Sequence, residues 1–445
     1  MKKQFKAGAA SVVINNDIGS MIQGAGVPDQ RVEAIHDDLE ANALYLDDGQ
    51  TRLLFITCDL PNIETARNRT IAEAIATDTG LDADSIIIGS SHTHGGPVMM
   101  HTNYLKPVDE VYFAKLLNWL RQIAAAALAN ATPARLGWGI GNARLGYNRR
   151  VCYSDNSHTM YRQGGRHGDF TGLEGPDDTA TLALAVFNDD NTPRAILQHG
   201  TGHPTAFYGQ RFLSADYPGL ARRLLREAYR SPLPVLFYNG AEGDISMPQQ
   251  MWPQQTADNT ELRIYRFGTA LAGETLRLLH EMRPQSEVSL THHHAMLDLP
   301  VRLPDPEAVA AGRAVLARYD AGEKVSGNEA IFAWGPVLLY NRFAANPVDT
   351  LPFNAIRIND LLLATQPFEL FCQYQIDIKR RSPTPNTIIF GLTGGSGGYL
   401  PTLAAALGGG YSGVPFAWAR FEPAVGCKVV DTISNMLHQI WKKDS

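Results

Sequence analysis

The chain has 445 residues and a formal net charge of −6, with 44% hydrophobic and 19% charged residues, a composition typical of a soluble globular protein. This length can bury a large core, and the acidic balance excludes the basic surface that nucleic-acid binding requires. The four cysteines are widely spaced without a CxxC pair, so we expect free thiols and a cytoplasmic location. We expect no signal peptide, membrane span or stable membrane association, because no long apolar segment follows the basic amino terminus.

The first third of the chain alternates between strand and helix patterns. Residues 5–60 predict strands joined by glycine-rich turns, and residues 65–79 predict a helix that stops at Gly80. Residues 86–88 predict a buried strand, and residues 107–130 contain a long amphipathic helix. This alternation predicts a mixed α/β domain.

The remaining two thirds continue the pattern, with one long polar interruption at residues 139–171. We interpret its core, residues 148–166, as a loop that sets specificity. Further strands are predicted at 179–188, 194–199, 233–238, 299–302, 354–365 and 388–392, and helices at 214–229, 256–282, 305–319, from Pro367 onward, and 424–441. Residues 320–352 carry no clear pattern. Without a repeat or linker, we predict one large domain, residues 1–445, of mixed β-sheets flanked by helices.

Two histidines stand just past the predicted strand at residues 86–88. His92 and His94 are one residue apart and are followed by a Gly-Gly-Pro turn. In extended backbone, residues i and i+2 project to the same side, so both imidazoles can face one cleft. Neutral imidazole is a good Zn²⁺ ligand. This pair therefore begins a candidate metal site, although a pair of structural histidines has about equal weight on these residues alone.

Metal-binding side chains recur at other predicted strand ends. His203 follows the strand at 194–199, Glu369 follows the strand–turn–strand at 354–365, and Tyr399 follows the strand at 388–392. Strand ends are where α/β sheets place their ligands. Histidines with one carboxylate and a position for water compose a catalytic zinc site. The triplet His292–His294 is not expected to join it, because adjacent strand residues face opposite sides.

Several segments, in the same order along the chain, resemble the neutral (non-lysosomal, alkaline) ceramidase family. The segment Ser91–Pro97 is similar to that family's T-H-T-H-S-G-P, and Glu242–Ser246 is similar to its G-D-V-S-P. The other matching segments are Ile35-His36-Asp37, Asn148-Arg149, Gly175-Pro176-x-Asp178, His203-Pro204-Thr205, Pro367-Phe368-Glu369 and Gly397-Gly398-Tyr399. The likeness runs from about residue 5 to the carboxyl terminus and covers the family's catalytic domain, without the immunoglobulin-like domain of its full-length members.

The resemblance implies a zinc hydrolase and assigns roles to particular positions. It implies Zn²⁺ ligation by His92, His203, Glu369 and Tyr399, with a metal-activated water as nucleophile. His94 and Tyr399 are implied to act on the carbonyl or on protons. The remaining implied site residues are Asp244 and Ser246 among the catalytic groups, and Asn148, Arg149, Gly398 and Tyr411 on the substrate side. Ser246 as a covalent nucleophile is a weaker alternative, because no histidine near it in sequence suggests a triad.

The sequence also departs from the family. Met247 interrupts the Ser-Pro pair, Ser412 stands where an acidic residue is expected, and no long apolar acyl channel is evident. We therefore expect a zinc-dependent hydrolase of an amide or ester, including lactones, with a small polar or sugar-derived substrate. The alternatives are a true ceramidase and a non-catalytic metal-binding homologue. A phosphate-binding enzyme built on the glycine-rich residues 19–26 is weaker, because the loop lacks GxGxxG and P-loop spacing. A homo-oligomer is compatible with the sequence.

Overall fold

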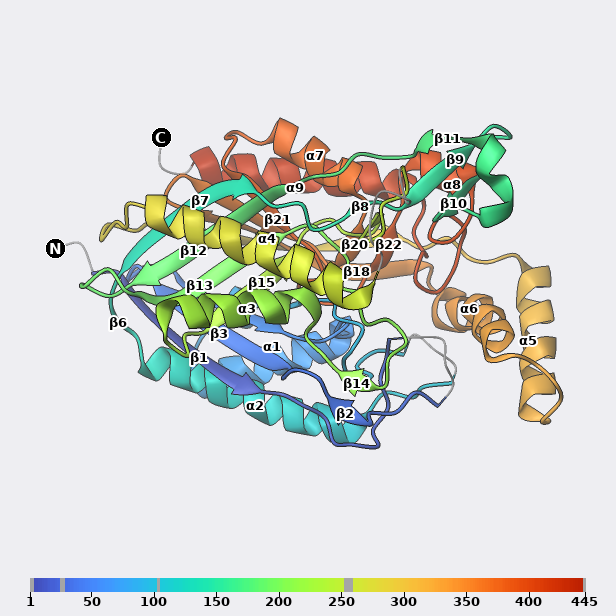
Figure 1. The fold of residues 1–445 in the computed structure, drawn as a ribbon, viewed down its shortest axis with the longest axis horizontal. Coiled ribbons are helices and arrows are strands. Elements are labelled where there is room, and N and C mark those ends of the chain that lie inside the picture. The colour runs from blue at the N-terminus through green and yellow to red at the C-terminus, as the bar shows by residue number, and fades with distance from the viewer. Residues whose placement is uncertain (1–3, 25–28, 102–104, 252–258, 443–445) are drawn as a thin grey trace.

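The computed structural model describes residues 4–24, 29–101, 105–251 and 259–442. Within these ranges three sheets form the framework (Figure 1). The first sheet is β5-β4-β3-β1-β6, the second β15-β13-β12-β7 and the third β17-β18-β19-β21. Their strands are β1 (Lys6–Val13), β3 (Glu40–Asp47), β4 (Arg52–Cys58), β5 (Ile86–Ser90), β6 (Thr132–Pro133), β7 (Arg135–Asn142), β12 (Ala180–Phe187), β13 (Pro193–Gly200), β15 (Val235–Asn239), β17 (Leu290–Pro300), β18 (Val348–Ile358), β19 (Leu361–Thr365) and β21 (Thr387–Phe390).

Nine α-helices are described, and six of them cover the outer faces of the sheets. The nine helices are α1 (Thr65–Thr79), α2 (Glu110–Ala129), α3 (Asp216–Tyr229), α4 (Thr260–Glu281), α5 (Pro306–Asp320), α6 (Gly327–Phe343), α7 (Cys372–Arg381), α8 (Leu403–Gly408) and α9 (Ala424–Lys442). Helices α1 and α2 pack on the first sheet, α3 and α4 on the second, and α7 and α9 on the third. A buried apolar cluster drawn from all three sheets fills the space between them. Figure 1 shows α5 and α6 projecting at one end.

Each sheet contributes one parallel strand pair, and the carboxyl ends of these pairs converge. The pairs are β4–β5, β13–β15 and β19–β21. Backbone hydrogen bonds join the three ends: the Ser90 amide donates to the Leu392 carbonyl, and the Gly391 amide donates to the Asn239 carbonyl. Because polar groups at parallel strand ends collect at a common edge, this junction positions the candidate site.

The prediction of an irregular loop at residues 139–171 is wrong. The segment contains the end of β7 and the short strands β8 (Tyr147–Asn148), β9 (Arg150–Tyr153), β10 (His158–Met160) and β11 (Phe170–Leu173), of which β9–β11 form a small sheet. In β7, a Cβ at Gly137 or Gly139 would lie 3.3 Å or less from Met282 or Leu278. These glycines let α4 approach the sheet closely. Because glycine has no side chain to contribute to an apolar alternation, they also obscure the strand pattern in the sequence.

The predicted helix start at Pro367 is also wrong. Residues Phe368–Leu370 form strand β20, which pairs in parallel with β22 (Gly398–Leu400), and helix α7 begins only at Cys372. Helix α6 and the start of β18 occupy most of the unassigned residues 320–352. Residues 25–26 of the glycine-rich segment and residues 256–258 of the predicted helix at 256–282 lie outside the described residues.

The predicted fold class, mixed sheets flanked by helices in an α/β arrangement, is confirmed. All four cysteines are free thiols, as expected. In the described part of the chain, no helix combines the length and apolar character needed to cross a membrane.

His199 in β13 yields a test of the buried core. It is fully buried beside Phe390, and burial lowers its pKa to about 3. An unfolded histidine titrates near about 6.5, so between these pH values the unfolded state binds a proton that the native state does not. Acidification from pH 7 to pH 5 is therefore expected to cost about 2 kcal/mol through this residue alone.

His199→Leu is expected to reduce the loss of unfolding free energy between pH 7 and pH 5 by that amount, as measured by urea denaturation of metal-free protein. The exposed His280→Leu in α4 serves as the control and is expected to leave the loss unchanged. An equal pH dependence in His199→Leu and the unmodified protein would contradict the assignment.

Candidate metal centre

Two histidines and a glutamate meet at the junction of the three sheets. His92 follows β5, His203 follows β13, and Glu369 lies in β20, just after β19. The Nε2 atoms of His92 and His203 are 3.0 Å apart, and Glu369 Oε2 lies 3.4 Å from His92 Nε2 and 3.7 Å from His203 Nε2. Tetrahedral ligands at zinc–ligand distances of about 2.0–2.1 Å are about 3.3 Å apart. These three atoms therefore fit three corners of a zinc site.

The Nδ1 atoms of His92 and His203 fix the orientation of the two imidazole rings, which leaves each Nε2 available to a metal ion. His92 Nδ1 lies 2.5 Å from the Pro61 carbonyl oxygen, and His203 Nδ1 lies 3.1 Å from the Glu242 carbonyl oxygen. Each Nδ1–H donates to a carbonyl, so both Nε2 lone pairs point at one another and at Glu369. Such an arrangement requires a positive charge between the groups, supplied by a proton or a metal ion.

His92 itself adopts a left-handed backbone conformation, with φ of 71°. The expectation that His92 and His94 continue as extended backbone is therefore wrong at His92. Their proximity is nevertheless as predicted, with ring centroids 5.0 Å apart. The His92 amide is held by the Leu60 carbonyl, which helps to maintain a conformation that costs a non-glycine residue about 1–3 kcal/mol.

The electrostatics of the three residues are those of a buried charge cluster. Burial opposes ionisation, yet the Glu369 carboxylate raises the pKa of His92, and His92, with Tyr399 and Arg149, lowers the pKa of Glu369. Burial, reinforced by Arg149, lowers the pKa of His203 well below its ordinary value. At neutral pH, His203 is therefore an unprotonated imidazole and Glu369 is a carboxylate.

Tyr399 and Arg149 stand on one flank of the cluster. An Arg149 Nη2–H donates to the Tyr399 hydroxyl oxygen at 3.1 Å and to the Gly243 carbonyl at 2.7 Å. The Tyr399 hydroxyl also hydrogen-bonds Glu369. Burial and the Glu369 charge raise the Tyr399 pKa well above its usual value. The Tyr411 ring centroid lies 5.6 Å from that of Tyr399.

A cavity of about 200 Å³ opens onto this cluster. Its lining includes His92, Glu369, Tyr399 and Tyr411 from the predicted site, together with apolar groups of α6 and Trp418. His94 also lines it, with Nδ1 3.2 Å from the Gly24 carbonyl oxygen, while its Nε2 has no hydrogen-bond partner. Burial, followed by the nearby His92, lowers the His94 pKa to about 3. His94 is thus a neutral imidazole at the cavity.

The other predicted site residues are not among the described lining residues of this cavity. Asn148 Nδ2 donates to Asp244 Oδ2 at 2.8 Å, and the Cys372 amide donates to Asp244 Oδ1 at 2.7 Å. Ser246 Oγ is hydrogen-bonded to the Tyr161 hydroxyl at 2.9 Å. Gly398 has a φ of 70°, and a Cβ there would lie 2.5 Å from the Trp418 carbonyl oxygen. Their contacts connect the loops that carry Arg149, Glu369 and Tyr399, and their assigned roles stay predictions.

Sequence reasoning assigned no role to Glu242, although the structure places it at the cluster. Glu242 is fully buried and offers a carboxylate oxygen within 4.8 Å of the ligand atoms of His92, His203 and Glu369. It follows β15 by three residues. The sequence signal that could have identified Glu242 is the same as for His92 and His203: a side chain able to bind metal just past a buried strand.

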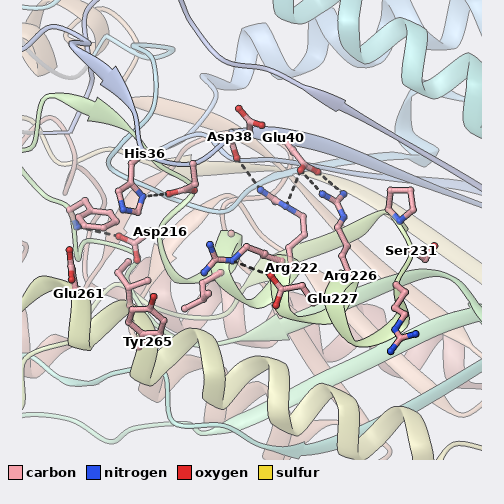
Figure 2. A pocket seen from close by; sticks show the side chains of 18 residues that line it. His36, Asp38, Glu40, Asp216, Arg222, Arg226, Glu227, Ser231, Glu261 and Tyr265 are labelled. Carbon is pink, nitrogen blue, oxygen red and sulfur yellow. Dashed lines mark hydrogen bonds and ion pairs between the residues drawn. The ribbon is translucent and has the colours of Figure 1, made fainter.

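A second cavity, of about 740 Å³, lies between α3 and the first turns of α4 (Figure 2). Ion pairs dominate its wall: Arg226 binds Glu40 through two bonds of 2.6 Å and 2.8 Å, and Arg222 Nε lies 3.3 Å from the same carboxylate. None of its described lining residues belongs to the histidine–glutamate cluster. We therefore do not place the reaction in this cavity, although it is the larger of the two.

Comparisons with known proteins bear on the fold of the chain. No protein-family model matches the chain, and no curated protein matches it. Among solved structures, a neutral ceramidase from Pseudomonas aeruginosa superimposes with a TM-score of 0.70 at 16% identity, covering 99% of this chain and 75% of that chain. A ceramidase complexed with C2 gives a TM-score of 0.71 at 15% identity, with coverage of 99% and 76%. The chain therefore has the neutral ceramidase fold.

Proposed function

We propose that this protein is a zinc-dependent hydrolase that cleaves an amide or ester bond, including a lactone, with a metal-activated water. The observation that carries the proposal is the spacing of 3.0–3.7 Å among the candidate ligand atoms of His92, His203 and Glu369, of which His92 and Glu369 line a cavity. A divalent zinc ion held there would lower the pKa of water to about 7 and polarise a carbonyl oxygen. The structural likeness to ceramidases, which are named for amide hydrolysis, supports the same class of reaction.

The residues around the cavity have separable tasks. We propose that neutral His94, whose Nε2 has no hydrogen-bond partner, accepts a hydrogen bond at that nitrogen from the attacking water and orients it. We propose that the Tyr399 hydroxyl, held by Arg149, turns its proton from Glu369 to the developing oxyanion. Apolar walls around the cluster exclude bulk water and strengthen both interactions. His92, His203 and Glu369 hold their positions through the strand ends that carry them.

The cavity volume bears on the substrate. About 200 Å³ is below the usual range of about 300–1,000 Å³ for drug-sized ligands. It favours a compact substrate, and we retain the proposal of a small polar or sugar-derived ester, lactone or amide. Unpaired cysteines agree with the proposed cytoplasmic location.

Ceramide hydrolysis is the second candidate, because one observation favours it. Phe332 and Tyr208 line the cavity and are 53% and 55% exposed. Two exposed aromatic rings at a cavity suit an apolar group that extends from the cleaved bond towards solvent. Comparing a short-chain N-acylsphingosine with small sugar lactones on the same preparation decides between the two substrate classes.

The first experiment is elemental analysis of protein purified without a chelating step, followed by an ester and amide panel. The expected result is about one zinc per chain, lost on chelation together with hydrolysis and restored with it by added zinc. Zinc binding without hydrolysis of any substrate would instead support the non-catalytic metal-binding homologue. No metal and no uptake on titration would contradict the proposed function.

The Tyr399→Phe variant tests whether Tyr399 acts as a metal ligand or as an oxyanion donor. Its oxygen already accepts from Arg149 and hydrogen-bonds Glu369, so we expect zinc content to be retained. Loss of one oxyanion donor is expected to lower kcat about 100-fold or more. The buried Tyr374→Phe, whose hydroxyl binds the Pro401 carbonyl, is the control and should keep kcat within about twofold. Zinc loss in Tyr399→Phe would make Tyr399 a ligand instead.

A further inference from the structure

The Glu242 carboxylate has no partner in the structure. The residue is fully buried, and neither Oε1 nor Oε2 accepts a hydrogen bond. An ionised carboxylate buried without a hydrogen bond costs several kcal/mol, and burial raises the pKa of Glu242 to about 8 although His92 lies nearby. Its position just past β15 is held by the backbone, because the Gly243 amide donates to the Leu370 carbonyl at 2.9 Å. The chain therefore maintains an acidic group where it has no protein partner.

The same carboxylate is directed at the metal cluster. One of its oxygens lies within 4.8 Å of the ligand atoms of His92, His203 and Glu369, and these atoms lie as close to one another. The ligand atoms of a tetrahedral zinc ion are about 3.3 Å apart, so a shift of about 1.5 Å or less brings the Glu242 oxygen to that spacing. Glu242 is thus within reach of an ion held by the other three residues, after a small side-chain adjustment.

Glu242 is fully buried and does not line the described cavity. The cavity is lined by His92 and Glu369, whereas Glu242 and His203 are not among its described lining residues. A ligand on the buried side leaves the cavity-facing position free for water and substrate, as catalytic zinc sites require.

We propose that Glu242 is a further metal ligand, which adds a second carboxylate to the centre formed by His92, His203 and Glu369. The inference rests on the proposed function, because it concerns the same metal. Two carboxylates neutralise the charge of a divalent cation in a dry site, and they add oxygen ligands that suit harder cations such as Mn²⁺ more than a histidine-rich set does. The partnerless carboxylate and its place beside three other ligand atoms then have one explanation.

Glu242 makes two separate contributions, which the test must keep apart. Its backbone carbonyl accepts from His203 Nδ1, and substitution of the side chain leaves that bond in place. Glu242→Gln is nearly isosteric and removes only the charge. Replacement of a group outside the coordination sphere weakens metal binding about 10–100-fold, so a direct ligand is recognised by a larger loss.

The experiment measures zinc affinity of the purified full chain by competition with a chromogenic chelator. Glu242→Gln is expected to weaken zinc binding by more than about 100-fold, to weaken Mn²⁺ binding further, and to change the visible spectrum of the Co²⁺-loaded protein. Glu369→Gln is the comparator for a ligand, and Glu40→Gln, at a buried carboxylate away from the cluster, is the control with unchanged affinity.

Zinc affinity in Glu242→Gln within about threefold of the unmodified protein, with an unchanged cobalt spectrum, would overturn the inference while leaving the proposed function intact. Absence of zinc binding by the unmodified protein would overturn both. If Glu242→Gln does not fold, Glu242→Asp takes its place: the shorter carboxylate is expected to weaken zinc binding and alter the cobalt spectrum, and unchanged values would overturn the inference.

Discussion

Replacing His92 by alanine is expected to abolish zinc binding and hydrolysis together. The variant removes one of three ligand atoms that lie within 3.7 Å of one another and leaves Glu369 without its nearest cationic partner. We expect zinc affinity to fall by more than about 1,000-fold, since even residues outside the coordination sphere contribute about 10–100-fold. Hydrolysis is expected to fall in proportion, because the water then has no Lewis acid beside it.

His293→Ala is the matched control, because it removes a histidine from the triplet that stands out most in the sequence. In the structure its neighbours His292 and His294 both bind Asn354 Oδ1, at 2.8 Å and 3.1 Å, and the described metal clusters contain no member of the triplet. Zinc content and rates should match those of the unmodified protein. Retention of zinc in His92→Ala, measured by elemental analysis after dialysis, would remove His92 from the ligand set.

Replacing Arg222 by methionine is expected to cause the largest loss of stability at a position away from the metal centre. Arg222 Nη1 lies 2.7 Å from Asp59 Oδ2, and its Nε lies 3.3 Å from Glu40 Oε1, with all three side chains at most 10% exposed. Removing one member of a buried ion network leaves an uncompensated charge and costs about 3–5 kcal/mol. Urea denaturation at neutral pH measures the change in unfolding free energy.

Arg223→Met on the same helix is the control. Arg223 is 61% exposed and lies 3.9 Å from Glu227, so the change is expected to stay within about 0.5 kcal/mol. Adding Asp59→Asn to Arg222→Met should recover part of the loss, because it removes the stranded carboxylate. A loss below about 1 kcal/mol in Arg222→Met would show that water or rearrangement compensates for the missing guanidinium.

The elements that the sequence predicted well are those whose pattern is local. Helix α1 matches its predicted residues and ends with Gly80 in the left-handed conformation, and the buried strand at residues 86–88 is β5. Apolar periodicity and a glycine stop are properties of adjacent residues, so no distant contact is needed to recognise them. The same local signal places His92, His203 and Glu369 just past the ends of predicted strands.

Short elements that depend on a distant partner were missed. Strand β20 exists because Glu369 pairs with Tyr399, thirty positions along the chain, and a proline before it suggested a helix. Strands β9, β10 and β11 pair among themselves across irregular connections. Three or four residues carry too little periodicity to identify a strand, and their stability comes from ladder bonds to residues that a local window does not contain.

The sequence by itself determined the fold class, the chemical character of the site and most of its candidate ligands, because residue type and strand-end position are local properties. Only the tertiary structure decided which of these groups meet. His92 and His203 are 111 residues apart, and three parallel strand pairs from three sheets bring their ring nitrogens together. The same convergence buries the Glu242 carboxylate without a hydrogen-bond partner, and Ser246 is hydrogen-bonded to Tyr161. Ligand geometry is a property of distances between segments, which sequence spacing does not contain.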